Sequence, residues 1–462
     1  MRHKTDTKLA LELIRRTRRC LTNAVRLLPQ LNANRRMILL ATWGLFAGLT
    51  FLMISAGSFS TLLGIRAELE KLPTIISGGI TTAYYAGFLI GSWYSLRALR
   101  SVGHIRVYAA LASLLSASTL VTGLFDSPII WLIMRVSTGF CLAGLYVVAE
   151  SWLNGMAENH YRGRLLAIYN VVTIGAWGLG QLLVFNFDAR NLSGYAFAAI
   201  VASLAVIPIS ISEQAATPAI ENHLHLSLRD LAKIVPTGAG TILLVGLAHG
   251  GILGMAVIHA TREGLSIGRI GILVAVLQLG GMALTWPISS ASDDIDRRII
   301  GLLCCLAVIA LGAVMLSQPT GNNWTILLLF AIGGFSFPLY AIGGAYTNDW
   351  VSPEQMGAAA SQLVTLYGFG AMIGPLVAAP FLDIIGTQGF AWSIISLHAL
   401  VLLFLIYRIR AWHAPVTTKH WDDVSFHGRA FFIPATIVSL GVNRRGRSAH
   451  QRQQTAEQRQ QQ

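Results

Sequence analysis

Two side chains with useful chemistry interrupt strongly apolar stretches of the chain. Arg135 lies within residues 126–154, and His249 lies near the middle of the uncharged stretch 234–261. An arginine in an apolar helix can bind an anionic substrate or take part in a coupling relay, or it can point outward or bind a backbone carbonyl. Imidazole titrates close to neutral pH, so His249 can bind substrate or couple transport to a proton, or it can be a buried, hydrogen-bonded histidine.

Other catalytic or metal-binding patterns are absent from the sequence. Its four cysteines, Cys20, Cys141, Cys304 and Cys305, show neither metal-ligand spacing nor the framework of a disulfide-rich domain. We find no P-loop, no paired acids, no H-E-x-x-H and no nucleophile elbow. We therefore expect no metal, no cofactor and no enzyme.

The elements that must position Arg135 and His249 follow from composition. Of the 462 residues, 54% are hydrophobic and only 12% are charged, against about 25% charged in soluble proteins, which excludes a water-soluble globular enzyme. Helical stretches long enough for a hydrocarbon core of about 30 Å occur at 37–65, 72–96, 107–125, 126–154, 165–187, 191–212, 234–261, 270–292, 355–382 and 384–407. The uncharged stretch 299–348 is broken at the turn-forming residues 317–323 and adds two more. The sequence thus predicts an all-α membrane protein with twelve transmembrane helices.

The basic residues predict how these helices are oriented. With the amino terminus inside, 28 of the 34 Lys and Arg residues fall on the cytoplasmic side. Because Lys and Arg in short loops face the cytoplasm, we expect a multi-pass inner-membrane protein with both termini cytoplasmic. The net charge of +13 then faces an anionic inner leaflet, and we expect no nucleic-acid partner.

An internal repeat divides the chain. A constant offset of 194 residues aligns identical residues of the fourth and fifth spans with those of the tenth and eleventh. The matched pairs are Gly139 and Gly333, Leu145 and Leu339, Tyr146 and Tyr340, Asn154 and Asn348, Gly163 and Gly357, and Gly180 and Gly374. We expect a basic amphipathic tail at 1–36, six-helix bundles at 37–212 and 236–410 joined by a cytoplasmic linker at 213–235, and a partly disordered tail at 411–462.

Several motifs resemble those of the major facilitator superfamily, and within it the bacterial YcaD-like group. The resemblance rests on Arg135-Val-Ser-Thr-Gly-Phe140, Tyr146-Val-Val-Ala-Glu-Ser151, Arg162-Gly-Arg-Leu-Leu-Ala167 and Gly180-Gln-Leu-Leu183. The superfamily's loop motif G-x-x-x-D-R-x-G-R-R is degraded between the second and third spans. Gly103 and Arg106 match it, but Arg100 stands where the Asp belongs. The second copy retains Asp293, Arg297 and Arg298.

This resemblance implies two six-helix bundles that rock around a central site lined by the first, fourth, seventh and tenth spans. Polar and aromatic residues on the faces expected to line the cavity are further candidates for substrate contact, or else for packing: Tyr146, Asn170, Gln278, Tyr340 and Tyr367. We expect a monomeric secondary transporter of a small solute, which is either coupled to protons or acts as a uniporter. The alternative is a transport-silent membrane receptor with the same fold.

A second group of residues is expected to act as a cytoplasmic latch. Glu150 ends the fourth span near basic residues of two loops, namely Arg97, Arg100, Arg106, Arg162 and Arg164. Asp293 with Arg297 and Arg298 forms the equivalent group in the second half. Such pairs can hold one access state and break in the other, or they can be ordinary surface salt bridges worth under about 1 kcal/mol.

Overall fold

The computed structural model describes residues 43–156, 159–211, 226–317, 323–352 and 355–411. The side chains of 96, 154–164, 166 and 167 are not described. The tails expected at 1–36 and 411–462 and most of the expected linker therefore lie outside the described residues, apart from Ala411 itself. The rest of this linker contains the short helix α8 (Leu228–Ile234), whose N-cap Ser227 accepts a hydrogen bond from the backbone N–H of Asp230.

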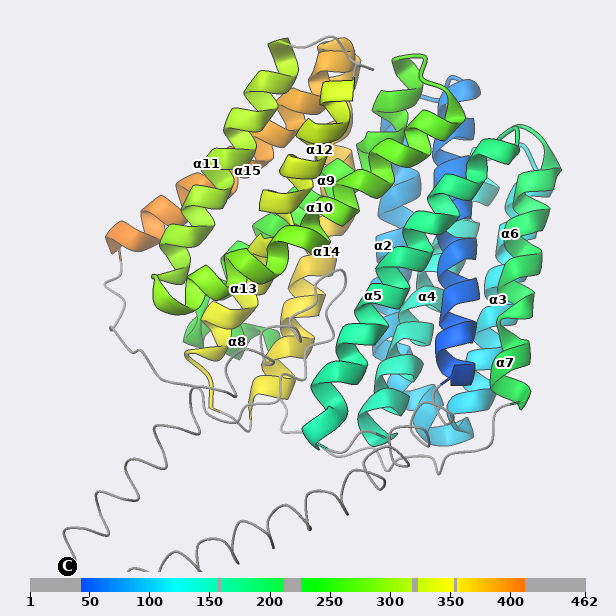
Figure 1. The fold of residues 1–462 in the computed structure, drawn as a ribbon, viewed down its shortest axis with the longest axis horizontal. Helices are drawn as coiled ribbons and strands as arrows, with labels where there is room; N and C mark the ends of the chain where they lie inside the picture. The colour runs from blue at the N-terminus through cyan, green and yellow to red at the C-terminus, as the bar shows by residue number, and fades with distance from the viewer. Residues whose placement is uncertain (1–42, 157–158, 212–225, 318–322, 353–354, 412–462) are drawn as a thin grey trace, which may run out of the picture.

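The described residues form two groups of helices that stand side by side (Figure 1). The first group holds the helix Trp43–Leu69, α2 (Thr74–Val102), α3 (His104–Leu124), α4 (Pro128–Met156), α5 (Asn159–Leu183), α6 (Leu192–Leu204) and α7 (Val206–Ile211). The second holds α9 (Pro236–Arg262), α10 (Ile267–Asp294), α11 (Arg297–Ser317), α12 (Asn323–Ser336), α13 (Pro338–Asn348), α14 (Met356–Ile384) and α15 (Gly389–Ala411). We call them the N-half and the C-half.

Eleven helical segments of the described chain are long and apolar enough to cross a membrane, with α6–α7 and α12–α13 each counted as one. The twelfth is α2, which has 29 residues but is less apolar. It carries threonines, serines and the pair Tyr84-Tyr85, and it packs against α4 and α14, so its polar residues lie inside the protein. The prediction of an all-α membrane protein with twelve spans in two bundles is confirmed.

Glycine allows α2 and α4 to touch backbone to backbone. A Cβ atom on Gly87 would lie 1.9 Å from the carbonyl oxygen of Val136, and one on Gly139 would lie 2.0 Å from that of Tyr84. No side chain fits at such distances, so only glycine permits this approach. The close crossing holds Arg135 on α4 next to the tyrosines of α2.

The same crossing recurs in the C-half between α10 and α12. A Cβ atom on Gly280 would lie 1.9 Å from the carbonyl oxygen of Phe330, and one on Gly333 would lie 1.8 Å from that of Leu277. Gly333 is the residue that the 194-residue offset pairs with Gly139. The repeat therefore preserves a packing contact, which explains why glycine stands at both positions.

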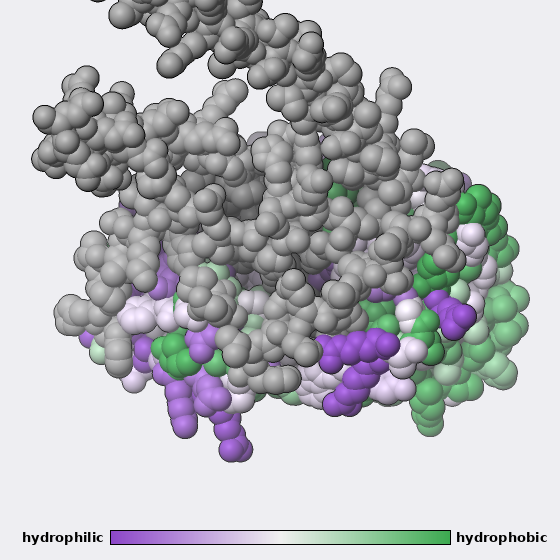
Figure 2. Space-filling model, turned by 90° about the horizontal axis from the view of Figure 1, so that it is seen from below, coloured by the Kyte–Doolittle hydropathy of each residue, from purple (hydrophilic) through white to green (hydrophobic). Residues whose placement is uncertain are grey.

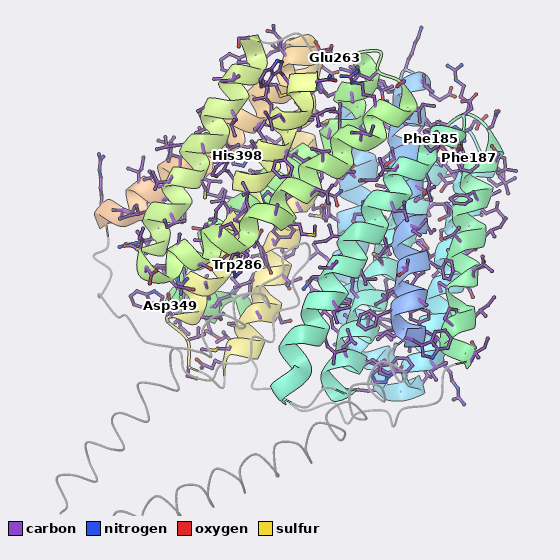
Figure 3. All side chains as sticks on the ribbon, in the orientation of Figure 1. Phe185, Phe187, Glu263, Trp286, Asp349 and His398 are labelled. Carbon is purple, nitrogen blue, oxygen red and sulfur yellow. The ribbon has the colours of Figure 1, made fainter. Side chains whose placement is uncertain are left out.

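The surface and the two ends of the bundle differ in character. Large apolar side chains such as Leu303 and Leu403 are more than half exposed on outward faces, as expected for residues that contact lipid. Seen from below, one flank is hydrophobic and hydrophilic residues gather along an edge (Figure 2). Glu263 and Asp349 mark opposite ends of the C-half (Figure 3), and we name the ends of the molecule the Arg262 end and the Asp349 end.

Candidate functional site

Arg135 is a buried cation surrounded by aromatic rings. Its side chain is 5% exposed, and its guanidinium carbon lies 4.7 Å from the ring centroid of Tyr84 and 5.4 Å from that of Phe59. Its Nε is buried without a hydrogen-bond partner. None of the five N–H groups of this guanidinium has an acceptor among the described residues.

The rings compensate for only part of the cost of burying this charge. A desolvated cation–π contact contributes about 2 kcal/mol, whereas the effective penalty for burying an ion is several kcal/mol. Buried arginines usually recover the difference through carboxylates or carbonyl groups. Arg135 has neither among the described residues, so the site is suited to an acceptor that comes from outside the protein.

Tyrosines from both halves surround the same region. In the N-half, the ring centroids of Tyr84 and Tyr85 are 5.2 Å apart, and Tyr146 lies within electrostatic range of Tyr84. In the C-half, the rings of Tyr340 and Tyr367 pack edge to face at 5.1 Å. Tyr367 lies within electrostatic range of both Tyr85 and Tyr84. The structure thus places two of the predicted residues, Tyr146 and Tyr367, near Tyr84, which contacts Arg135. The third, Tyr340, packs against Tyr367.

His249 belongs to a hydrogen-bond network inside the C-half. Its Nε2 lies 3.1 Å from the carbonyl oxygen of Ser336, and its Nδ1 lies 3.2 Å from the hydroxyl of Tyr367. A carbonyl can only accept, so Nε2 carries a proton and donates to Ser336, while Nδ1 shares a hydrogen bond with the hydroxyl of Tyr367. The Ser336 hydroxyl in turn lies 2.8 Å from Nε2 of His398, whose Nδ1 donates to the carbonyl of Ile394. Each nitrogen of both imidazole rings therefore has a hydrogen-bond partner.

The break between α12 and α13 explains why His249 is needed. Pro338 interrupts the helix, and the backbone N–H of Tyr340 bonds to Phe337 at 3.3 Å instead of to Ser336. The carbonyl of Ser336 would then be a buried acceptor without its helical partner. His249 supplies the missing donor, which favours the hydrogen-bonded interpretation of this residue.

Replacing His398 by phenylalanine is expected to destabilise the protein. His398 is fully buried, and the substitution leaves the Ser336 hydroxyl without this hydrogen-bond partner, which costs about 1–3 kcal/mol. The melting temperature in detergent should fall by several degrees. Leu403→Ala, on the exposed face of the same helix, is the control and should change it little. An unchanged melting temperature in His398→Phe would show that the network adds no stability.

Gln278 and Asn170, two further predicted site residues, lie on α10 and α5. Gln278 Nε2 on α10 lies 3.5 Å from Gln181 Oε1 on α5, which makes a polar contact between the halves, while its own Oε1 is buried and unpaired. Asn170 is buried on α5, and its backbone carbonyl accepts a hydrogen bond from the hydroxyl of Thr173. Their roles in transport stay predictions.

A charged network joins the two halves at the Arg262 end. Arg262, the last residue of α9, bonds through Nε to Glu68 at 2.8 Å and through Nη2 to the hydroxyl of Thr74 at 2.5 Å. Both partners belong to the N-half. Asp383 of α14 lies 3.6 Å from Nη2 of Arg262 and accepts a hydrogen bond from Thr74. We call these four residues the Arg262 network.

Further contacts between the halves continue inward from this network. The hydroxyl of Thr82 donates to the carbonyl of Met372 at 2.7 Å, and the rings of Trp93 and Phe369 lie 6.4 Å apart. At the Asp349 end, the lower ends of α5 and α14 stand apart (Figure 1). The halves are thus joined at the Arg262 end and diverge toward the other.

Comparisons with known proteins agree with this arrangement. The family model described as Major Facilitator Superfamily matches residues 238–446, and one described as Sugar (and other) transporter matches 41–212. The "Uncharacterized MFS-type transporter YcaD" of Escherichia coli O45:K1 (strain S88 / ExPEC) is 27% identical over 379 residues, which cover 81% of this chain and 97% of the relative. The chain is therefore similar to major facilitator superfamily transporters over both of its halves.

Solved structures of superfamily transporters share the fold. The nucleoside transporter NupG superposes with a TM-score of 0.68 at 12% identity, covering 80% of this chain and 98% of NupG. A bacterial homolog to the human lysosomal transporter Spinster, in an inward-facing and unoccupied conformation, superposes with a TM-score of 0.62 at 15% identity. That comparison covers 81% of this chain and 95% of the other.

In the superfamily loop motif between α2 and α3, one residue has a clear structural role, which is to form the turn. Gly103 has a φ of +85°, a left-handed conformation that favours glycine, and it forms the turn between the two helices. The expected latch arginines beside it are exposed and form no ion pair with a described carboxylate: Arg97, Arg100 and Arg106.

Glu150 is half-buried among tyrosines of both halves. The helix α4 continues past it to Met156, so Glu150 lies inside the helix and not at its end. Its carboxylate accepts a hydrogen bond from Tyr169 at 3.5 Å and lies within electrostatic range of Tyr146 and Tyr340. The side chains of its expected partners Arg162 and Arg164 lie outside the described residues, so the latch stays a prediction.

The second copy of the superfamily motif forms ion pairs at the Asp349 end. Arg297 contacts Asp293 at 3.0 Å and Asp349 at 2.8 Å, and Arg298 contacts Asp296 at 2.8 Å. Burial raises the pKa of the Asp296 carboxyl, but the hydrogen bonds and charge of Arg298 outweigh this and hold it below its usual value. All these residues belong to the C-half, so these pairs do not join it to the N-half.

Sequence reasoning missed several residues of this site. Tyr84 and Tyr85 contact or face Arg135, and His398 completes the His249 network. The unusually polar character of α2 was the one available signal for the tyrosine pair. The Arg262 network was missed because its members stand at the ends of helices that are far apart in the sequence.

Proposed function

We propose that this protein is a secondary active transporter that moves a small solute by alternating access of its two halves. The supporting observation is the Arg262 network, which joins the halves at one end only. Such a contact is a reversible link that must break when that end opens. Similarity to superfamily transporters supports transport and does not favour the receptor alternative, and we propose no enzymatic activity.

We further propose that the Arg262 end faces the outside of the inner membrane. The Lys and Arg residues of the connecting loops concentrate at the other end, which the charge bias assigns to the cytoplasm. In this orientation, the described conformation is closed to the outside. We propose a monomer whose basic segments face anionic lipid and which has no nucleic-acid partner. We also propose that transport is coupled to protons.

Cross-linking across the Arg262 end tests alternating access. The side chains of Thr74 and Asp383 touch, so Thr74→Cys with Asp383→Cys should form a disulfide between the halves on oxidation. In membrane vesicles, uptake or efflux of a solute selected from labelled sugars, nucleosides, amino acids and organic acids should stop. Flux should return after reduction.

A pair within one half provides the control. Ser116 and Ser203 lie on α3 and α6, with their hydroxyls 2.9 Å apart, and Ser116→Cys with Ser203→Cys should retain flux when cross-linked. Undiminished flux through the locked Thr74–Asp383 pair contradicts alternating access at this end. Absence of flux for every solute tested favours the receptor.

A further inference from the structure

We propose that the substrate is a small organic anion with a planar, apolar body, and that Arg135 binds its acidic group. This inference rests on the proposed transport function and adds the chemical class of the solute. It starts from Arg135, a residue that is 5% exposed and whose guanidinium has no acceptor among the described residues. A carboxylate, phosphate or sulfonate supplies both the acceptor oxygens and the missing negative charge.

A second buried arginine, Arg66, provides a comparison, because its guanidinium is paired with a carboxylate of the protein. Arg66 is 3% exposed, and it also lies over aromatic rings, 5.2 Å from that of Trp131 and 5.5 Å from that of Tyr195. Unlike Arg135, it forms an ion pair with a carboxylate, Asp126. Nε of Arg66 is buried without a hydrogen-bond partner, as is Nε of Arg135, and the same is true of Nη1 of Arg66. The two arginines therefore differ in the counter-ion, which a ligand would supply to Arg135.

The position of the nearest acid on the same helix argues against a cationic substrate at this site. Glu150 lies 15 residues from Arg135 along α4, which corresponds to about 22 Å of helix rise. A cationic group near Arg135 would be repelled without a compensating carboxylate. The surrounding tyrosines offer ring faces for a planar body and hydroxyl groups for hydrogen bonds.

The site and the Arg262 network share α2. Thr74 begins this helix, and Tyr84 lies ten residues further on, about 15 Å along its axis. Tyr367 on α14 likewise shares a helix with Asp383 of the network. An anion that draws Arg135, Tyr84 and Tyr367 together therefore acts on the same two helices that close the Arg262 end.

Ligand-dependent stabilisation of the purified full-length protein tests the charge requirement. Benzoate, phenylphosphonate and benzenesulfonate are compared with the neutral benzamide and the cationic benzylamine. We expect at least one of the three anions to raise the melting temperature and to bind at least tenfold more tightly than benzamide. Absence of stabilisation by all three, or equal stabilisation by benzamide or benzylamine, overturns the proposal.

Arginine variants test the assigned residue. Arg135→Gln should weaken anion binding by about ten- to a hundredfold, as expected for a charge-assisted hydrogen bond, without lowering the melting temperature of the unliganded protein. Arg66→Gln, the matched control, should lower that melting temperature and leave anion affinity unchanged. Equal loss of affinity in both variants, or unfolding of Arg135→Gln, would show that Arg135 is structural.

Flux measurements separate this inference from the transport proposal. Anion binding that depends on Arg135 without flux in vesicles supports the anion site and overturns transport. Flux of neutral solutes that is unchanged in Arg135→Gln supports transport and overturns the anion site.

Discussion

Replacing Gly139 by valine is expected to eliminate most of the folded protein. A Cβ at this position would lie 2.0 Å from the carbonyl oxygen of Tyr84 and 3.0 Å from the backbone nitrogen of Phe88. Neither backbone atom can move without separating α2 from α4. We expect a loss of more than about 3 kcal/mol, which is large against a typical folding free energy of about 5–15 kcal/mol. The yield of monodisperse protein on size exclusion and its melting temperature measure the effect.

Two further glycine variants make this test specific. A Cβ atom added to Gly175 on α5 would meet no neighbouring atom within 4 Å, so Gly175→Val should leave yield and melting temperature nearly unchanged. Gly333→Val should reproduce the defect in the C-half, where the Cβ would meet the carbonyl oxygen of Leu277 at 1.8 Å. Similar behaviour of Gly139→Val and Gly175→Val would mean that the close crossing is not required.

Arg262→Gln is expected to shift the conformational equilibrium toward opening of the Arg262 end. The substitution removes the ion pair with Glu68 and weakens the hydrogen bond to Thr74, both of which join the halves. A hydrogen bond to a charged group contributes about 1.5–3 kcal/mol, so the ratio of open to closed states should rise by about ten- to a hundredfold. Maleimide labelling of Ser77→Cys, buried on α2 one turn from Thr74, should accelerate by the same factor.

The control for this experiment is another arginine at the same end. Arg269 bonds to Asn323 at 3.1 Å within the C-half, so Arg269→Gln should not change the labelling rate. Both variants are compared in a Cys20→Ser background, since the three other cysteines are buried. If Arg262→Gln labels no faster than Arg269→Gln, the network does not control opening.

The membrane fold was predictable because its main driving force is visible in composition. Apolar stretches of sufficient length must form helices in a bilayer, where backbone groups have no other partners. The offset between Gly139 and Gly333 also revealed the repeat, since both positions need glycine for the same contact. The one span that composition detects poorly is α2, because its polar residues face protein and not lipid.

The candidate site was predictable only in part. Arg135 stands out in the sequence because charge inside a membrane is costly and rare. Its neighbours Tyr84 and Tyr85 do not stand out, since the direction of each helix face depends on how the helices pack. His249 was recognised as a polar residue, but its hydrogen bond to Ser336 follows from the break at Pro338, which frees a specific carbonyl.

The sequence by itself determined the twelve spans, their duplication and the position of Arg135 inside the fourth of them, because hydropathy and charge act on each segment separately. The tertiary structure alone decided that Arg135 has no counter-ion among the described residues, that its ring contact Tyr84 lies near tyrosines of both halves, and that Arg262 joins the halves at one end. These features depend on contacts between residues as far apart as Glu68 and Arg262. Such contacts are set by helix packing, which no single segment of the sequence specifies.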